Sequence, residues 1–154
     1  ERRLQKGDFV VVDFGCVTDG YHSDMTRTFG VGDVDDELKK IYQITLDAQM
    51  RCLDALHAGM TGGAFDAVAR KMIENAGYGE NFGHGLGHGF GLEIHEPPRA
   101  GRESPDALEP GMTVTVEPGI YLEGKGGVRI EDCVVLTETG CLNLVSSAKD
   151  LLFI

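Results

Sequence analysis

Two aspartates stand on either side of a turn signal in the first thirty residues. Asp13 ends the run GDFVVVD, Asp24 lies in YHSDMTRTF, and Thr18-Asp19-Gly20 lies between them. If the two segments pair as a hairpin, both carboxylates point to one face. They are directly opposite with Thr18-Asp19 at the centre and diagonal with Asp19-Gly20 there. Carboxylates this close repel unless one is protonated or a cation lies between them. The alternative is that the hairpin has a different register, or that both carboxylates face water.

Three of the five histidines fall within 12 residues of one another in a glycine-rich segment. The stretch GHGLGHGFGLEIHE carries His84, His88 and His95. Neutral imidazole is a common metal ligand, and glycines let a backbone lie close to another group. A two-residue period places His84 and His88 on one face of a strand and His95 on the other, so a shared site requires a bend or a bulge. The alternative is that these histidines belong to the core.

Two glutamates interrupt or end apolar strand patterns. Glu117 follows TVTV and precedes Pro118, and Glu131 lies inside GGVRIEDCVVL. A buried carboxylate is costly without a partner. Arg129 lies two residues before Glu131, on the same face of an extended strand, and is one candidate partner. A metal ion shared with the aspartates and histidines is the other.

The elements that must position these groups are strands with two helices among them. Apolar and β-branched runs predict strands over residues 7–13, 21–29, 112–116, 128–137, 142–145 and 151–154, with a further candidate at 92–94. Helical spacing predicts helices over 35–57 and 63–76. Because strands and helices are grouped rather than alternating, the sequence favours an α+β fold with a largely antiparallel sheet.

Both predicted helices have an apolar face. In the first helix it comprises Leu38, Ile41, Thr45, Ala48, Cys52 and Leu56. Asp35 or Asp36 can cap the start of this helix, and Gly59 can end it. In the second helix, which Gly77 ends, the residues expected to point inward are Phe65, Val68, Met72 and Ile73.

The composition narrows the class of protein. The 154 residues suit one domain, and 42% hydrophobic with 25% charged residues is ordinary globular usage. The net charge of −11, without a basic stripe, makes nucleic acid a poor candidate partner. No apolar run is long enough for a membrane-spanning helix, so a membrane is not an expected partner either. The four cysteines lack CxxC spacing, so we expect reduced, mostly packed thiols of a cytoplasmic protein.

Five motifs occur in an order that resembles one enzyme family. They are DFG, SDMTRT, GHGLGHGFGLEIHE, VEPGIY and GGVRIED, which begin at Asp13, Ser23, Gly83, Val116 and Gly126. Together they resemble the pita-bread metallopeptidases, most closely the proline-specific branch of aminopeptidase P and prolidase. The resemblance runs from Gly7 to Ile154. The methionine aminopeptidases share that fold but differ in sequence around the last glutamate.

The resemblance implies a site for two divalent metal ions. Asp13 would bind one ion, and Asp24 and Glu131 would bridge the two. His88 and Glu117 would bind the second ion. Four carboxylates and one imidazole form an oxygen-rich set that suits Mn²⁺ or Co²⁺, with Zn²⁺ and Fe²⁺ as further candidates.

The resemblance also implies an activity. His84 and His95 would stand beside the metals, contact substrate and stabilise the tetrahedral intermediate, with Arg129 next to the ligands. A hydroxide that bridges the ions would hydrolyse the N-terminal Xaa-Pro bond of a peptide or dipeptide, so the expected partner is a peptide with proline at its second position. The alternatives are a methionine-aminopeptidase-like enzyme and a non-catalytic binding module on the same fold. The binding module predicts no metal, and the five intact ligand positions argue against it.

The family's pattern extends beyond this chain. In the family, further helices and strands precede the segment that matches Glu1–Gly7 and form the other half of a pseudo-symmetric fold. The expectation is therefore that residues 1–154 are the C-terminal portion of a pita-bread catalytic domain. A portion of this kind can leave core surface uncovered and pair with a second copy, so a homodimer is also expected.

Overall fold

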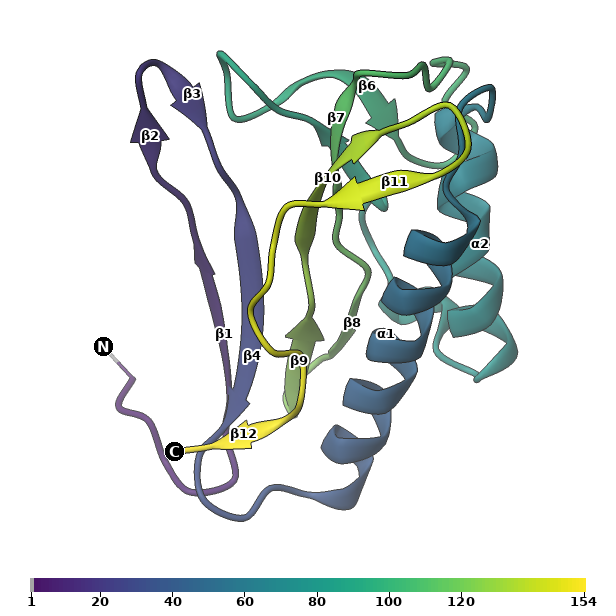
Figure 1. Ribbon diagram of the computed structural model, residues 1–154. Helices are drawn as coiled ribbons and strands as arrows, with labels where there is room; N and C mark the ends of the chain where they lie inside the picture. The colour runs from purple at the N-terminus through teal and green to yellow at the C-terminus, as the bar shows by residue number, and fades with distance from the viewer. Residues whose placement is uncertain (1) are drawn as a thin grey trace.

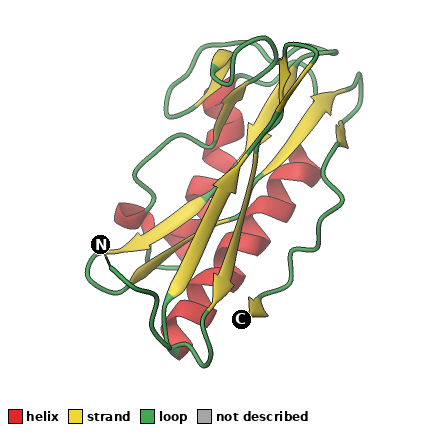
Figure 2. Ribbon diagram, turned by 90° about the vertical axis from the view of Figure 1, so that its left-hand side faces the viewer, coloured by secondary structure: helices red, strands yellow, loops and turns green. Residues whose placement is uncertain are grey.

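The computed structural model describes residues 2–154, in which strands form one layer and two helices the other (Figure 1, Figure 2). The helices are α1 (Asp36–Ala55), α2 (Gly62–Asn75) and a short 3-10 turn η1 (Gly79–Asn81). The strands of the first hairpin region are β1 (Phe9–Phe14), β2 (Val17–Thr18), β3 (Tyr21–His22) and β4 (Met25–Gly30). The later strands are β5 (Gly87–Gly89), β6 (Glu96–Ala100), β7 (Thr113–Val116), β8 (Gly119–Leu122), β9 (Gly126–Arg129), β10 (Asp132–Leu136), β11 (Cys141–Asn143) and β12 (Leu152–Phe153).

Two sheets carry most of these strands. One is fully antiparallel, in the order β11-β10-β7-β5-β6, and the other has the order β1-β4-β12, with β12 parallel to β4. An isolated antiparallel bridge between Thr26 and Glu131 links β4 to the segment between β9 and β10. Helices α1 and α2 lie side by side against the strands in both ribbon views (Figure 1, Figure 2). The predicted α+β class with a largely antiparallel sheet is confirmed.

The first hairpin has the second of the two predicted registers. Asp19 and Gly20 both have positive φ, at 53° and 86°, which is the geometry of a tight hairpin turn. Asp13 pairs with Thr26, so Asp24 lies two residues from Asp13's direct partner and on the same face of the hairpin. The two carboxylates are therefore diagonal neighbours, as predicted for a turn centred on Asp19-Gly20.

Helix α1 has the predicted apolar face, since all six of its expected inward residues are buried. Asp35 is the cap, and its carboxylate accepts a hydrogen bond from the Glu37 amide at 2.8 Å. The helix ends at Ala55, two residues before the predicted end, and Gly59 follows with φ of 89°.

Helix α2 buries a charged pair that the apolar pattern did not predict. Phe65 and Ile73 are fully buried as expected, whereas Val68 and Met72 are only half-buried. Asp66 and Arg70 take the inward positions instead and form an ion pair at 2.6 Å. Arg70 also donates to the carbonyls of Phe82 and His84, at 2.9 and 2.8 Å. The inner face of α2 therefore binds the backbone of the glycine-rich segment as well as the apolar core.

Three strand predictions were wrong. The strand predicted over 21–29 is divided into β3 and β4, with a break at Ser23-Asp24. Residues 92–94 form part of a loop, and the strand lies further on, in β6, which contains Pro97 and Pro98. Proline is tolerated there because β6 is the edge strand of its sheet. The expected strand 128–137 is divided into β9 and β10, with a break at Ile130-Glu131. That break turns the chain from the β8–β9 hairpin into the larger sheet.

The cysteines are free among the described residues, in agreement with the expected reduced state. Cys52 and Cys133 are buried and Cys141 is half-buried, while Cys16 is exposed on the first hairpin. The expectation of packed thiols is therefore met by three of the four cysteines. Within residues 2–154, neither helix has the length and apolar character needed to cross a bilayer.

Candidate metal centre

A cleft of about 530 Å³ brings together every side chain that the sequence singled out for chemistry. Its lining includes Asp13, Asp24, His84, His88, His95, Glu117, Glu131 and Arg129. These residues lie on β1, at the start of β4, in and around β5, and at the ends of β7 and β9. The cleft therefore depends on both sheets, and no single hairpin or helix builds it.

Asp24, His88 and Glu131 form the centre of the cleft. One nitrogen or oxygen atom from each lies within 4.8 Å of the others. His88 Nε2 is 3.8 Å from Asp24 Oδ2 and 3.3 Å from Glu117 Oε1. One imidazole thus faces carboxylate oxygens from two different sheet segments.

The orientation of His88 is set by its neighbours. His88 Nδ1 lies 2.9 Å from the Gly89 carbonyl, and since a carbonyl only accepts, Nδ1 must carry the hydrogen. The lone pair of the neutral ring is then on Nε2, the atom that faces the carboxylates. Thr115 holds the same region together, because its hydroxyl accepts from the His88 amide at 3.0 Å and donates to Glu117 Oε1 at 3.0 Å.

A bulge brings the third histidine to the same cleft. The pairing of β5 with β6 shifts register between His88 and Gly89, and His95 lies in the loop directly before β6. The rings of His88 and His95 are 4.3 Å apart, centroid to centroid. The two-residue period of a strand required a bend or bulge for the three histidines to share one site. The bulge after His88 is that irregularity.

Arg129 pairs with a different acid from the one that the sequence suggested. Its guanidinium forms an ion pair with Asp13, and its Nε lies 3.9 Å from Glu117 Oε2. Glu131 instead accepts a hydrogen bond from the Thr26 hydroxyl at 2.6 Å. The strand break at Ile130-Glu131 explains the difference, because Arg129 and Glu131 no longer lie on one face of one strand.

His84 belongs to a hydrogen-bonded group on one side of the cleft. Its Nδ1 donates to the Gly85 carbonyl at 2.8 Å, which leaves Nε2 to accept from the Tyr121 hydroxyl at 3.0 Å. Tyr121 also accepts from Arg129 Nη1 at 3.3 Å. Tyr121 therefore connects the imidazole of His84 to the guanidinium that holds Asp13.

The cleft carries more negative charge than its own cations neutralise. Burial, the charge of Glu117 and that of Asp24 raise the pKa of Glu131 to about 8. Burial and the neighbouring charge of Asp13 also raise the pKa of Asp24. Burial is the largest single effect on His88 and disfavours its charged form. The hydrogen bonds to Glu117 and to the Gly89 carbonyl, together with the charges of Glu117 and Asp24, outweigh burial, so the pKa of His88 is raised.

These shifts and the donor set fit a divalent cation. A metal ion would supply the charge that protonation of Glu131 and His88 otherwise supplies, and it would bind the Nε2 lone pair of His88. Carboxylate oxygens with one imidazole nitrogen favour Mn²⁺-like ions over soft metals. The residues present are therefore suited to the metal site that the sequence predicted.

Sequence reasoning missed several side chains of this region. Thr26 and Tyr121 lie inside two of the motifs, SDMTRT and VEPGIY, so their position next to the candidate ligands was a usable signal. Thr115 alternates with buried valines and gave no signal of its own. Arg99 lines the cleft from β6, a strand that was not predicted.

Comparison with known proteins defines the class. Residues 1–138 match the model of metallopeptidase family M24, and the chain belongs to this family. It is 46% identical over 152 residues to an Xaa-Pro dipeptidase of Pyrococcus furiosus, covering 99% of the chain and 44% of that protein. It is 48% identical over 154 residues to an uncharacterized peptidase of Bacillus subtilis, covering 100% and 44%. The chain thus spans less than half the length of these relatives.

Solved structures share the fold. The Xaa-Pro dipeptidase of Bacillus anthracis superposes with a TM-score of 0.96 at 52% identity, over 98% of this chain and 42% of that one. A variant of Escherichia coli aminopeptidase P superposes with a TM-score of 0.87 at 31% identity, over 97% and 41%. The expected pita-bread α+β fold, and its proline-specific branch, are confirmed.

Proposed function

We propose that the chain is the metal-binding portion of an exopeptidase that hydrolyses the N-terminal Xaa-Pro bond of peptides or dipeptides. The observation that carries the proposal is the cluster of Asp24, His88 and Glu131, with ligand atoms within 4.8 Å of one another. The names of its relatives, Xaa-Pro dipeptidases among them, support the substrate class and favour it over a methionine-aminopeptidase-like activity.

Five residues are proposed to hold two divalent ions, of which Mn²⁺ is the first candidate. They are Asp13, Asp24, His88, Glu117 and Glu131, with Asp24 and Glu131 shared between the ions. When bound, such a pair of ions supplies a water of lowered pKa and polarises the carbonyl of the scissile bond. The chain's own part is to keep carboxylates and one neutral imidazole in place in a cleft that substrate can enter.

His84 and His95 are proposed to act on substrate. His95 is exposed at the cleft, next to His88, where its imidazole can contact a peptide carbonyl. His84 Nε2 accepts from Tyr121 and lies in the same cleft. Arg129 holds Asp13, and through Tyr121 it also orients His84, so it is proposed to support the ligands without contacting substrate.

We further propose that residues 1–154 correspond to the C-terminal portion of the catalytic domain. Support comes from the coverage, since the chain spans 42–44% of relatives that it matches over 98–100% of its own length. Access of longer peptides would then depend on surfaces that this chain does not include.

The experiment that tests the function is a calorimetric titration of the metal-free chain with Mn²⁺, next to its Asp24→Asn variant. Asparagine keeps the shape of the side chain and removes the bridging charge. Two ions per wild-type chain, reduced to one or none in the variant, support the site, and hydrolysis of an Xaa-Pro peptide is then assayed with the loaded protein. Equal binding by the two proteins would contradict the proposed ligand set.

A further inference from the structure

Behind the cleft, Arg27 of β4 lies in a buried ion pair. Its side chain is 6% exposed, that of Asp132 is fully buried, and Arg27 Nη2 is 2.8 Å from Asp132 Oδ1. A pair buried this deeply is weak evidence for stability, because both groups lose their hydration. The contacts that the guanidinium makes indicate what else the pair does.

All five N–H groups of the Arg27 guanidinium have acceptors at 2.6–3.0 Å. Besides the carboxylate of Asp132, they are the backbone carbonyls of Thr26, Glu131, Ser147 and Ala148. Four of the five bonds thus go to backbone, and they join three segments that are distant in the sequence. The main role of the Arg27 side chain is therefore to connect these backbone segments, and neutralising the charge of Asp132 is secondary.

One nitrogen of Arg27 reaches both segments of the candidate ligands. Nη1 donates to the Thr26 carbonyl at 2.9 Å and to the Glu131 carbonyl at 2.6 Å. The Glu131 amide donates to the same Thr26 carbonyl at 3.1 Å, so Arg27 closes the isolated bridge between the two segments. Asp24 lies two residues before Thr26, and Glu131 is itself a candidate ligand.

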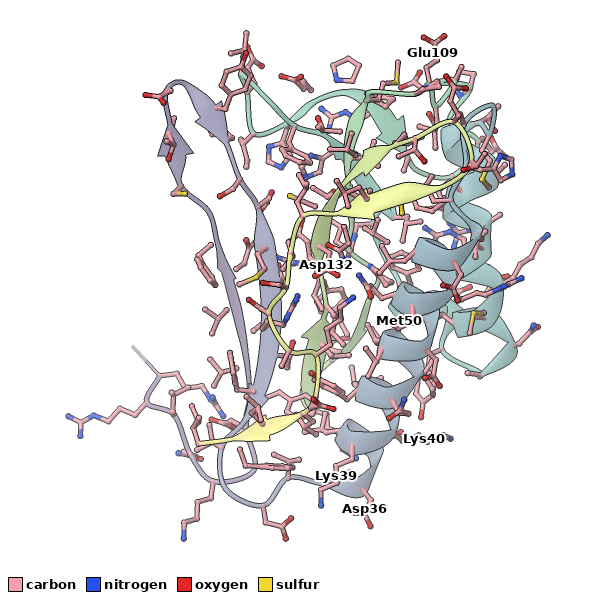
Figure 3. All side chains as sticks on the ribbon, in the orientation of Figure 1. Asp36, Lys39, Lys40, Met50, Glu109 and Asp132 are labelled. Atoms are coloured by element: carbon pink, nitrogen blue, oxygen red, sulfur yellow. The ribbon has the colours of Figure 1, made fainter. Side chains whose placement is uncertain are left out.

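Asp132 fixes the other end of this group. Its Oδ2 accepts from Gln49 Nε2 at 3.0 Å, Asn143 Nδ2 at 2.7 Å and Lys149 Nζ at 2.5 Å. Asp132 lies between the strands and α1, on which Gln49 sits (Figure 3). The Arg27 guanidinium is therefore held from α1, from β11 and from the C-terminal segment.

We propose that Arg27, held by Asp132, is a positioning residue of the candidate metal centre. It fixes the separation between the segment that carries Asp24 and the segment that carries Glu131. The proposal rests on the proposed function, since it concerns the same ligands. Lysine keeps the charge but has three donors at one point, so it cannot hold both carbonyls and Asp132 as the planar fork does.

The test compares Arg27→Lys with Arg70→Lys in the 154-residue chain. Arg70 is a matched control for metal binding, because it is also buried, paired with an aspartate and bonded to two carbonyls. Those carbonyls belong to Phe82 and His84, and Arg70 touches none of the five candidate metal ligands. Mn²⁺ affinity is measured by calorimetry, and the paired-ion spectrum by electron paramagnetic resonance. Arg27→Lys is expected to bind Mn²⁺ about 10–100-fold more weakly and to lose the paired spectrum. Arg70→Lys is expected to keep wild-type values, and wild-type binding by Arg27→Lys overturns the proposal.

Hydrogen exchange gives a readout that needs no metal. The Glu131 amide of Arg27→Lys is expected to exchange faster than the same amide of the wild type. The amides that pair β10 with β7 are expected to exchange at the same rates in Arg27→Lys as in Arg70→Lys.

If the wild-type chain binds no Mn²⁺, the proposed function fails, and the exchange rate of the Glu131 amide still decides whether Arg27 holds the bridge. If Arg27→Lys does not fold, Asp132→Asn takes its place, because it keeps an acceptor for Arg27 but removes the anion. Unchanged exchange at Glu131 in that variant also overturns the proposal.

Discussion

The Thr26 hydroxyl donates to Glu131 Oε2 at 2.6 Å across the isolated bridge that joins β4 to the segment between β9 and β10. This is a hydrogen bond between a neutral donor and a carboxyl group that is 2% exposed. It favours the ionised form of Glu131 against the effect of burial and of the neighbouring acids. Its loss should therefore be felt in both metal binding and stability.

Thr26→Val is expected to weaken Mn²⁺ binding about tenfold, because the ligand carboxylate loses the donor that orients it. The control is Thr28→Val on the same strand, whose hydroxyl donates to the Arg129 carbonyl at 2.9 Å. Each hydroxyl makes two hydrogen bonds, since Thr26 also accepts from Arg129 Nε and Thr28 from the Arg129 amide. Both variants should therefore lose about 1–3 kcal/mol of stability. Calorimetric affinities and urea unfolding measure the two effects. Equal Mn²⁺ affinities for the two variants would show that the hydroxyl of Thr26 has no special role.

Glu131→Gln should stabilise the metal-free protein at high pH. The pKa of Glu131 is about 8 in the folded chain, against about 4.3 when unfolded. The wild type therefore loses stability as pH rises between these values, with the full loss present above pH 8. Thermal melts in chelator should show the variant melting above the wild type at pH 8 and at the same temperature near pH 4. Mn²⁺ should raise the melting temperature of the wild type only, and a variant less stable at pH 8 would refute the account.

Thiol reactivity should separate the cysteines. Cys16 is exposed, whereas burial raises the pKa of Cys52 and of Cys133 to about 12. With a chromogenic disulfide at pH 8, one thiol per chain should react quickly, and Cys16→Ser should abolish that phase. The remaining thiols should react fully only in denaturant. A fast phase that persists in Cys16→Ser would show that Cys52, Cys133 or the half-buried Cys141 is accessible.

The apolar face of β1 should favour self-association. Val12 and Phe14 are 37% and 53% exposed, and β1 is the edge strand of its sheet. Exposed apolar edge strands pair readily with other chains. Sedimentation is expected to show a dimer of the 154-residue chain that Phe14→Lys weakens. A monomer at every concentration would remove the expectation of a homodimer.

Local patterns in the sequence were enough to predict much of the fold. The apolar periodicity of α1, the turn signal at Thr18-Asp19-Gly20 and the β-branched run of β7 are short-range signals, and the structure agrees with them. Strand β6 was missed because its prolines are acceptable only at a sheet edge, and edge position depends on the whole sheet. The same holds for the break before Glu131, which reflects the change from one sheet to another.

The candidate site was predictable by residue type but not by partner. The acids and histidines could be selected because charge and glycine are unexpected in apolar strands. The ion pair of Arg129 with Asp13 could not be predicted from the sequence, because it joins strands β9 and β1, which are far apart along the chain. The buried pair of Asp66 and Arg70 was missed for another reason: an i,i+4 pair on a helix is most often exposed.

The wide separation of the candidate ligands along the chain has a consequence for folding kinetics. Asp13 and Glu131 are 118 positions apart in the sequence but line the same cleft. Closing so long a loop is entropically costly, and contacts of this range form slowly. The complete cation site would therefore form only after most of the chain has been synthesised and has collapsed. A nascent chain that still lacked the β9–β10 segment would offer Asp13, Asp24 and His88 without the last carboxylate, so ion capture would serve as a late check that folding is complete.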